Sequence, residues 1–373
     1  MILNSKYWGV FCGTLTAVLW VLSIPPFDFP EAAYIAFVPL FLWLYTKPAQ
    51  QSVWIVGLAT GWLSWFVILM WLRHVTWFGT IALSGVLSLF FASWLYLGSS
   101  LLHHIEKRNI LLRALCFAGL AGAWVVLEWS RTWFLWGFPW APLSLSQWQR
   151  PVVLQIAAWT GAYGVSFLII FFNLCLAQTL RQRFVQKKAA LWMGFFSSDL
   201  YLGLSALFFC IYVFFYSLPA RDSTDEILTA AVVQPYILPD LKWEIDRNLE
   251  NLEALERQTL FVSTLESDII LWPESATPWP IIGSQQIRIR LERLVNEINK
   301  PILMGNISED TKTGEWSNGT FLVEPESGLS EQFYTKRELV PFGEYVPHPF
   351  GFIRKVVPLN GSFVPGDNVG LID

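Results

Sequence analysis

Long apolar stretches recur through the first 218 residues of the chain, and shorter apolar runs between polar segments follow them. A helix needs roughly 20 mostly apolar residues to cross the hydrocarbon core of a membrane, so the pattern predicts about seven spanning helices. They lie near residues 7–24, 31–46, 53–73, 80–102, 110–129, 152–179 and 199–217. The first stretch is too long, and too closely followed by others, to be a cleaved signal peptide.

The basic residues between these stretches indicate the orientation, because cytoplasmic loops of membrane proteins are enriched in Lys and Arg. Basic residues precede the first stretch and occupy alternate loops after it: Lys6, Lys47, Lys107, Arg108, Arg113, Arg181, Arg183, Lys187 and Lys188. The other loops are rich in Pro, Trp and Phe, with only Arg131 and Arg150 in the last of them. With an odd number of crossings, this places the N-terminus inside and the polar C-terminal part outside.

The composition changes at residues 220–226, Ala-Arg-Asp-Ser-Thr-Asp-Glu, which are typical of a linker. Beyond it, hydrophobic patterning predicts strands at residues 229–234, 268–272 and 301–306, helices at 243–262 and 285–299, and a hairpin from 320–323 and 331–334. Strands that alternate with helices are typical of a layered α/β domain. We therefore predict a transmembrane domain at residues 1–218 and an α/β domain at residues 219–373.

Composition agrees with this division and excludes some functions. The chain is 54% hydrophobic and 14% charged and contains 21 Trp, which is far more apolar than an average soluble domain. Its net charge is -4, and no basic tract interleaved with aromatic residues occurs, so we predict no nucleic-acid partner. No Gly-rich phosphate loop and no Cys/His metal spacing occurs either, so we predict no cofactor and no metal.

Two polar clusters in the C-terminal part carry the candidate chemistry. Glu274 directly follows Pro273 and the strand predicted at residues 268–272, a place where a carboxylate can act as a base. Further along the chain, Lys336 and Glu344 flank an apolar turn. Taken singly, each has a plainer interpretation: Glu274 as a strand-end acid, Lys336 as a solvated lysine and Glu344 as a turn acid.

The motifs around these residues resemble those of the carbon-nitrogen hydrolase (nitrilase-like) superfamily, whose domains are α-β-β-α sandwiches. The most specific are Trp-Pro-Glu-Ser-Ala at 272–276 and Lys-x-x-Leu-Val-Pro-Phe-Gly-Glu at 336–344. Ala-Val-Val-Gln at 231–234, Gly-Asn at 305–306 and Asn318 add to the likeness. With the apolar stretches in front, the chain resembles the apolipoprotein N-acyltransferases over nearly its full length, and Phe-Pro-Trp at 138–140 is similar to their outer loop.

The resemblance implies acyl transfer through a cysteine thioester. It makes Glu274 the general base that takes the thiol proton, and Lys336 the cation that stabilises the thiolate and the developing oxyanion. Glu344 would orient Lys336 or the incoming amine. Trp243 and Trp140 would contact the substrates, although Trp243 also fits simple packing in a core or at a membrane interface. A carboxylate is costly to bury unpaired, so contact between Glu274 and Lys336 is expected on physical grounds too.

The resemblance also implies substrates and a location. The acyl donor is expected to be a phospholipid, phosphatidylethanolamine, and the acceptor the N-terminal amine of a diacylglyceryl-Cys apolipoprotein. The chain is then expected to be a multi-pass protein of the bacterial inner membrane, with its C-terminal domain on the periplasmic side.

The sequence departs from the family in its cysteines. The family's nucleophilic Cys lies beyond the Lys-Glu cluster in a Cys-Tyr-Glu type motif, which this sequence lacks. Its four cysteines, Cys12, Cys116, Cys175 and Cys210, lie in apolar stretches, where a thiol is a small hydrophobe and a poor nucleophile. We therefore expect an α/β domain that is incomplete at its C-terminus and a chain that is inactive as written.

Alternatives to an active enzyme follow from the same features. A non-catalytic membrane remnant that binds phospholipid or lipoprotein would need no thiol. A transporter fits less well, because the apolar stretches lack paired charges and matched interruptions. Arg73 and Glu128, near the outer ends of two stretches, are costly places for charge; they either contact lipid head groups or extend toward the interface.

Overall fold

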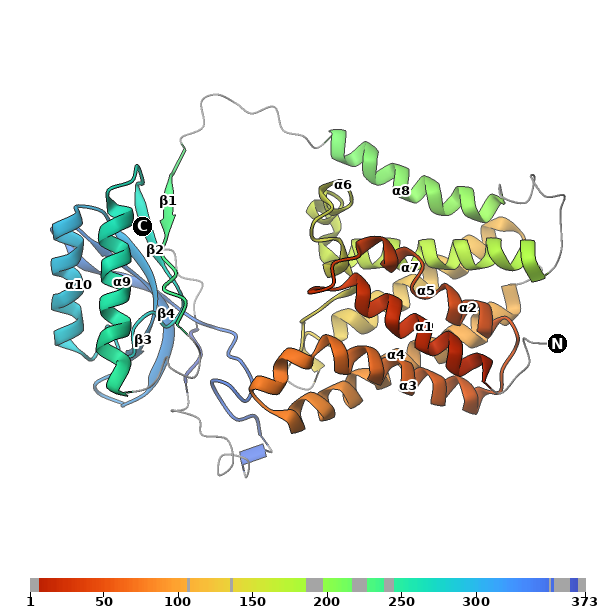
Figure 1. Ribbon diagram of the computed structural model, residues 1–373, viewed down its shortest axis with the longest axis horizontal. Coiled ribbons are helices and arrows are strands. Elements are labelled where there is room, and N and C mark those ends of the chain that lie inside the picture. Colours follow the sequence, from red (N-terminus) through yellow and green to blue (C-terminus); the bar gives the residue numbers. More distant parts are fainter. Residues whose placement is uncertain are drawn as a thin grey trace. The chain divides into compact units, whose positions relative to one another are not determined.

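The chain forms two units, each with its own hydrophobic core. The computed structural model describes residues 7–105, 108–134, 137–185, 197–216, 227–237, 245–348, 350–351 and 363–367. Contacts divide the chain into Met1–Ala220 and Arg221–Asp373, close to the predicted division after residue 218. In Figure 1 the first unit runs from red to light green and the second from green to blue.

The secondary-structure elements described in the first unit are all helical. Its elements are α1 (Trp8–Ser23), η2 (Pro30–Tyr34), α2 (Val38–Leu44), α3 (Gln50–Ile68), η3 (Met70–His74), α4 (Trp77–Ile105), α5 (Ile110–Ser130), η5 (Leu143–Gln147), α6 (Pro151–Leu154), α7 (Ala157–Leu180), η6 (Arg181–Val185) and α8 (Ser198–Tyr216). Five helices of the described part, α3, α4, α5, α7 and α8, are long and apolar enough to span a membrane; α1 and the segment Pro30–Leu44 are shorter apolar helices. The predicted helical membrane domain is confirmed.

Two predicted spans are interrupted. The span predicted at 53–73 ends as an α-helix at Ile68 and continues as the 3-10 turn η3. The span predicted at 152–179 divides into α6, which Pro151 begins, and α7, inside which Gly161 has φ +64°. Proline fits the first turn of a helix, so Pro151 suits the start of α6, and glycine tolerates the positive φ of Gly161 inside α7.

An aromatic cluster forms the centre of this core. The Trp20 ring lies 5.5 to 5.6 Å, between centroids, from the rings of Phe37, Trp65, Phe91 and Trp124. Edge-to-face and tilted pairs at this spacing are favourable beyond their buried area. Helices α3 and α4 pack closely beside this aromatic cluster. A Cβ on Gly61 of α3 would lie only 3.0 Å from the Ser88 Cα of α4.

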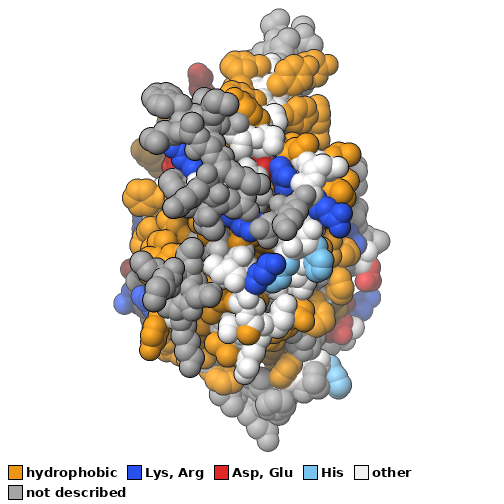
Figure 2. All heavy atoms as spheres, turned by 90° about the vertical axis from the view of Figure 1, so that its right-hand side faces the viewer, with side chains coloured by type: hydrophobic (Ala, Val, Ile, Leu, Met, Phe, Trp, Pro, Cys, Tyr) orange, Lys and Arg blue, Asp and Glu red, His pale blue; other side chains and the backbone are white. Residues whose placement is uncertain are grey.

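The basic loops lie at one end of this unit. His103, in the last turn of α4, contacts the carbonyl of Leu44 at 3.2 Å, and the Arg181 guanidinium lies 4.2 Å from the Tyr45 ring centroid. At the same end Arg113 of α5 pairs with Asp199 of α8. Figure 2 views this end, where Lys, Arg and His side chains gather among hydrophobic ones. The loops predicted to be cytoplasmic thus share one end, as far as the described residues reach.

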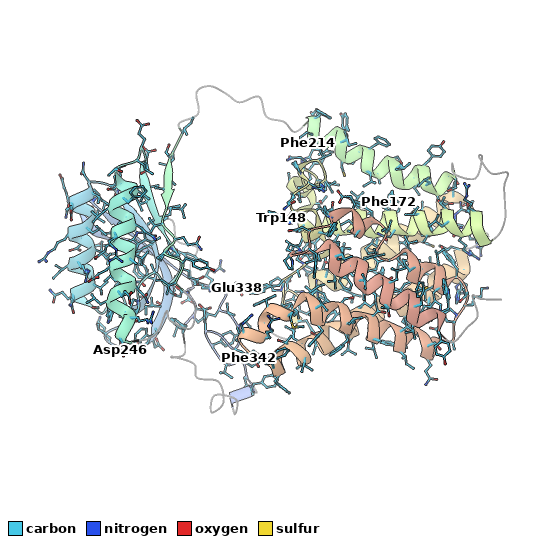
Figure 3. All side chains as sticks on the ribbon, viewed as in Figure 1. Trp148, Phe172, Phe214, Asp246, Glu338 and Phe342 are labelled. Atoms are coloured by element: carbon cyan, nitrogen blue, oxygen red, sulfur yellow. The ribbon has the colours of Figure 1, made fainter. Side chains whose placement is uncertain are left out.

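The opposite end is aromatic and holds other polar links. Trp148 donates to the Asp28 carboxylate at 2.9 Å, and Arg150 pairs with Glu31 at 2.5 Å. Trp148 and Phe214, which lies near the end of α8, are both at this end, and Phe172 lies midway along α7 (Figure 3). Helix α8 ends here.

The second unit is an α/β domain, as predicted. Its elements are β1 (Ala230–Val232), η8 (Ile245–Arg247), α9 (Asn248–Ser263), β2 (Ile269–Trp272), α10 (Gln285–Ile298), β3 (Ile302–Glu309), β4 (Trp316–Glu324) and β5 (Gly328–Thr335). The described strands form one sheet in the order β1-β2-β3-β4-β5, in which β1, β2 and β3 are parallel and β4 and β5 continue antiparallel. The domain fits the nitrilase-like α/β class, and the predicted hairpin is β4–β5.

Helices α9 and α10 cover one face of this sheet (Figure 1). Alternate strand residues, such as Ile270, Trp272 and Met304, are buried against leucines of both helices. The Trp272 indole also donates to the Thr259 hydroxyl of α9 at 2.9 Å. Because side chains alternate along a strand, the residues between these buried ones face the other side of the sheet. The candidate catalytic residues lie in the segments that follow β2 and β5.

Candidate active site

Glu274 lies just past the carboxyl end of β2, where the backbone crosses close to β3. A Cβ on Gly305 of β3 would come within 2.6 Å of the Glu274 Cα, so glycine at 305 permits this approach. The amide of Ala276 donates to the Gly305 carbonyl at 2.9 Å and fastens the crossing. The Trp-Pro-Glu-Ser-Ala motif and the Gly-Asn motif are therefore parts of one local structure.

Asn318 of β4 lies at the centre of the polar cluster. Its amide nitrogen donates to Glu274 Oε1 at 2.5 Å and to Glu344 Oε1 at 3.1 Å, and the residue is 4% exposed. Its backbone carbonyl accepts from the amide of Lys336 at 2.7 Å. One residue thus holds both carboxylates by its side chain and the start of the lysine segment by its backbone.

Lys336 directly follows β5 and joins the same two carboxylates. Its Nζ lies 2.9 Å from Glu274 Oε1 and 3.1 Å from Glu344 Oε1. The antiparallel register of β4 and β5, which pairs Gly319 with Thr335, brings Lys336 beside Asn318. The hairpin therefore sets the distance between the lysine and the two acids.

Glu344 belongs to a tight turn that closes on itself. Its amide donates to the Val340 carbonyl at 2.9 Å, and its Oε2 accepts from the Val340 amide at 2.7 Å. Phe342, inside the turn, has φ +63°, which is uncommon for a residue with a side chain. Because both backbone and carboxylate are fixed by Val340, the turn presents Glu344 Oε1 to Lys336 and Asn318.

The cluster carries two carboxylates and one ammonium at the surface of the domain. The side chains of Glu274, Lys336 and Glu344 are 62%, 26% and 14% exposed. Burial lowers the pKa of Lys336, but its hydrogen bonds to Glu274 and Glu344 and their negative charges outweigh burial and raise that pKa above the ordinary lysine value. Lys336 is therefore a cation at neutral pH and not a base.

This arrangement suits proton abstraction next to a developing negative charge. Glu274, the most exposed of the three, can accept a proton from a group that approaches from solvent, and Lys336 beside it stabilises an anion formed there. The structure brings together the three residues that the sequence suggested, Glu274, Lys336 and Glu344. Their catalytic roles stay predictions.

The two tryptophans suggested for substrate contact have different outcomes. Trp243 lies outside the described residues. Trp140 lies in the first unit, is 50% exposed and stacks on Trp71, with 4.7 Å between ring centroids and 24° between ring planes. An exposed aromatic ring on a stacked partner offers an apolar surface to a ligand, and this role of Trp140 also stays a prediction.

The cysteines all belong to helices of the first unit. Cys12, Cys175 and Cys210 are buried and Cys116 is partly buried, and all four are free. Residues 221–373 of the sequence contain no Cys. Within the described residues, no three His, Cys, Asp or Glu side chains come together in a way that suits a metal ion.

Sequence reasoning gave Asn318 no role, although it counted Asn318 toward the family likeness. The structure makes it a donor to both acids and leaves it almost fully buried. The available signal was an Asn inside a run with strand character, since a buried amide must find hydrogen-bond partners.

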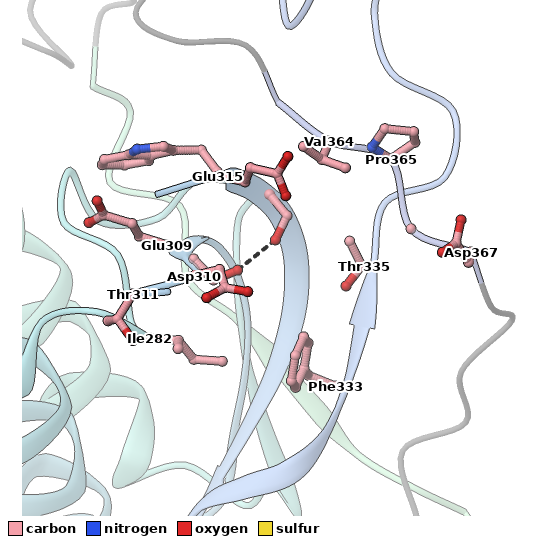
Figure 4. Close-up of a pocket in the computed structure, with 14 residues that line it drawn as sticks. Ile282, Glu309, Asp310, Thr311, Glu315, Phe333, Thr335, Val364, Pro365 and Asp367 are labelled. Atoms are coloured by element: carbon pink, nitrogen blue, oxygen red, sulfur yellow. Dashed lines mark hydrogen bonds between the residues drawn. The ribbon is translucent and has the colours of Figure 1, made fainter. Parts of the chain in front are cut away.

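A separate pocket of about 560 Å³ lies beside the cluster, lined from β3, β4, β5 and residues 364–367 (Figure 4). Ser317 and Thr335, next in sequence to Asn318 and Lys336, line it, and Ser317 shares a 2.7 Å hydrogen bond with Ser308. Its other polar lining includes the carboxylates of Glu309, Asp310, Glu315 and Asp367. The side chains of Glu274, Lys336 and Glu344 do not line this pocket, so the polar cluster and the pocket are distinct.

Comparison with known proteins agrees with both units. Residues 16–175 match the family described as "Apolipoprotein N-acyltransferase N-terminal domain". The apolipoprotein N-acyltransferase of Geobacter metallireducens is 30% identical over 371 residues, which cover 96% of this chain and 69% of that protein. That of Haemophilus influenzae is 25% identical, over 96% of this chain and 67% of that protein. That of Rickettsia prowazekii is 30% identical over 60% of this chain and 43% of its own length.

The likeness to the Geobacter protein spans the helical unit and the α/β unit together, at an identity that indicates common descent. These relatives are acyltransferases that act on apolipoproteins, as their names state. The chain therefore belongs to the apolipoprotein N-acyltransferase family of enzymes.

Proposed function

We propose that the site serves transfer of an acyl chain from a phospholipid, phosphatidylethanolamine, to the N-terminal amine of a diacylglyceryl-Cys apolipoprotein. In this scheme a cysteine thiolate attacks the ester carbonyl of the phospholipid, a thioester forms and a lysophospholipid leaves. The α-amine of the apolipoprotein then attacks the thioester, which forms the amide and releases the thiol. Both substrates are lipids, which accounts for an enzyme domain joined to a membrane domain.

The cluster of the second unit supplies the acid–base part of this scheme. Glu274 takes the thiol proton, and the Lys336 cation stabilises first the thiolate and then the tetrahedral oxyanion. Glu344, held by the Val340 amide, keeps Lys336 in place. Trp140 and Trp243 contact the lipid substrates. The observation that carries the proposal is the shared contact of Lys336 Nζ with Glu274 and Glu344 at 2.9 and 3.1 Å.

The thiol is the component that this polypeptide does not place at the cluster. Its four cysteines belong to membrane helices, and residues 221–373 contain none. We propose that the 373-residue chain by itself forms no thioester. The same observation favours a second candidate function, the non-catalytic binding of phospholipid or lipoprotein.

We also propose a location, the bacterial inner membrane with the second unit on the periplasmic side. The supporting observation is that Lys47, Arg113 and Arg181 lie at one end of the helical unit, and that the chain leaves α8 at the other end. A tag at Asp373 is expected to react with a reagent that does not cross the inner membrane. Protection of that tag in intact spheroplasts would contradict the proposal.

Intact-mass measurement separates the two functions. The 373-residue chain, mixed with phosphatidylethanolamine, is expected to gain no acyl group. A chimaera that adds the part of the Geobacter metallireducens relative that this chain does not match is expected to gain one acyl group, and to lose this ability when Glu274→Gln is introduced. An acyl adduct on the 373-residue chain would contradict the proposed lack of a nucleophile, and an active Glu274→Gln chimaera would contradict the role of Glu274.

Non-catalytic binding has a readout of its own. Native mass spectrometry of the detergent-released chain is expected to retain bound phosphatidylethanolamine. Trp140→Ala is expected to reduce this retention, whereas Trp272→Phe, a change in the core of the second unit, serves as the matched control. Equal retention by the parent chain and Trp140→Ala would remove Trp140 from the lipid-binding surface.

A further inference from the structure

A small cavity lies in the helical unit, near the end of α5 that is remote from the basic loops. Its volume is about 30 Å³, and its wall is mostly aromatic, with Trp65 and Trp124 among the rings. Glu128 and Arg131 of α5 also line it, as does Trp20 of α1. The cavity therefore joins an apolar wall to a charged pair.

Three buried polar atoms belong to these lining side chains and have no hydrogen-bond partner among the described residues. They are Trp20 Nε1, Glu128 Oε2 and Arg131 Nη1. The three residues are 1%, 4% and 5% exposed. Buried polar groups in folded proteins nearly always have partners, so three such atoms around one cavity indicate a bound polar group.

The remaining atoms of the pair are already engaged. Glu128 Oε1 accepts from the Leu143 amide at 2.7 Å and from Trp124 Nε1 at 3.3 Å, and Arg131 Nη2 lies 3.6 Å from it. The Arg131 guanidinium also lies 4.8 Å from the Trp65 ring centroid. Ser166 is close to the same carboxylate, and its hydroxyl accepts from the Ser144 amide. These contacts fix the pair, while Glu128 Oε2 and Arg131 Nη1, which belong to two side chains that line the cavity, make no hydrogen bond to the described residues.

The chemistry of the three atoms selects the bound group. Trp20 and Arg131 offer N–H donors, whereas Glu128 offers an acceptor, so the group must both accept and donate. A small anion would meet the Glu128 carboxylate, and a small cation would meet the Arg131 guanidinium. A volume of about 30 Å³ exceeds the roughly 10–15 Å³ that one buried water needs, and buried water usually makes about three hydrogen bonds.

We propose that this cavity binds one water molecule, which links Trp20, Glu128 and Arg131, and that the hydrated pair positions the loop that carries Trp140. The loop is fastened on both sides of Trp140. The Phe138 amide donates to the Arg131 carbonyl at 2.5 Å, and the Leu143 amide donates to Glu128 Oε1 at 2.7 Å. Between these points Trp140 stacks on Trp71.

Only the importance of Trp140 rests on the proposed function; the water site and the fastening of the loop do not. Glu128 and Arg131 are therefore positioning residues that act through the backbone of residues 138–143. Because neither readout below involves acyl transfer, failure of the proposed function leaves this inference standing, and failure of this inference leaves the proposed function standing.

Fluorine NMR of the full chain in detergent, with 5-fluorotryptophan in place of Trp, tests the water site. The signal of Trp20, assigned with Trp20→Phe, is expected to shift between H₂O and D₂O although Trp20 is 1% exposed. Trp272 is the control: it is 5% exposed and its indole is paired with Thr259, so its signal is expected to stay. A Trp20 signal that does not respond to D₂O would overturn the water site.

The signal of Trp140 tests the fastening of the loop. Glu128→Leu removes the acceptor for the Leu143 amide and is expected to move that signal, whereas Glu128→Gln keeps a carbonyl acceptor and is expected to leave it in place. Asp199→Asn is the matched control, since Asp199 is a buried acid at the other end of the same unit. Equal movement in Asp199→Asn and Glu128→Leu, or none in Glu128→Leu, would overturn the positioning role.

Discussion

Two ion pairs of the helical unit and the polar cluster of the α/β unit hold their charges in different settings. In the helical unit, the side chains of Arg113 and Asp199 are 12% and 0% exposed, and those of Arg131 and Glu128 are 6% and 3% exposed. In the α/β unit, Lys336 bridges two acids but remains 26% exposed, and Glu274 is 62% exposed. The first setting encloses charge, whereas the second leaves it in contact with solvent.

This difference separates structural charges from chemical ones. A buried charge pair must satisfy itself, because each ion has lost its water, and removing one partner leaves the other uncompensated. Side chains in a half-exposed cluster can release and accept protons, and the ion pairs between them contribute little to the free energy of unfolding. Acidic and basic residues therefore hold helices together in the helical unit and remain accessible to solvent in the α/β unit.

The largest expected effect comes from breaking a buried pair. Asp199 accepts from Arg113 at two positions, each at 2.9 Å, and from Gln182 at 3.1 Å. Asp199→Ala is expected to cost about 3–5 kcal/mol of unfolding free energy, because Arg113 stays buried without its partner. Denaturant titration in detergent, followed by circular dichroism, measures this cost.

A double variant is the control for that measurement. Arg113→Met with Asp199→Leu removes both charges and is expected to lose much less stability than Asp199→Ala alone. Equal losses in the single and the double variant would show that packing, not the uncompensated charge, sets the cost.

An intermediate effect is expected at the buried amide of the exposed cluster. Asn318→Ala removes donors to both Glu274 and Glu344 and is expected to cost about 1–3 kcal/mol. Hydrogen exchange of the β4 and β5 amides reports the loss locally. Unchanged exchange would show that solvent replaces the Asn318 amide without cost, so that the cluster resembles surface charge throughout.

The exposed cluster also predicts a pH dependence. Because the pKa of Lys336 is higher in the folded protein than in the unfolded chain, its contribution to stability is complete below the ordinary lysine value of 10.5 and is lost as pH rises through the higher folded value. The unfolding free energy of Lys336→Met should therefore approach that of the parent chain in this alkaline range. A constant difference between the two chains there would contradict the charge argument.

The smallest effect is expected at a fully solvated pair. Arg257 and Glu253 of α9 lie 3.8 Å apart with side chains 66% and 47% exposed. Arg257→Ala is expected to change the unfolding free energy by less than about 0.5 kcal/mol, because solvent and salt screen such pairs. A larger loss in the same titration would mean that the Arg257 stem contributes packing as well as charge.

Much of the fold could be predicted because its signals are local. Apolar length located the spans, and the period of apolar residues located β2, α10 and the β4–β5 hairpin within a few residues. The break between α6 and α7 at Gln155 and Ile156 was missed, because an apolar run does not show where a helix stops and restarts. The helix predicted from residue 243 begins as an α-helix at Asn248, after a 3-10 turn.

The candidate site was predictable where a motif names the residue, and not where tertiary contacts do. Glu274, Lys336 and Glu344 follow from two short motifs. The central place of Asn318 depends on the register between β3 and β4, which pairs it with Ile307, and no local pattern specifies that register. Glu128 of α5 likewise holds the Trp140 loop through the Leu143 amide, which is a tertiary contact between two helical segments. From the sequence alone, Glu128 was therefore only a charge in a costly position near the end of a span.

The order of the strands has a consequence for how the site forms during folding. Strands β3, β4 and β5 are sequential and antiparallel, so their contacts are local and are expected to form early. Strand β1 pairs in parallel with β2, and β2 with β3, across connections that contain α9 and α10. This pairing requires longer loops to close. Lys336 and Asn318 should therefore come together first, and Glu274 should join them last. In a pulsed hydrogen-exchange experiment, the amides of the β4–β5 hairpin should become protected before those of β2. Glu274 is therefore the last of the three residues to join the cluster.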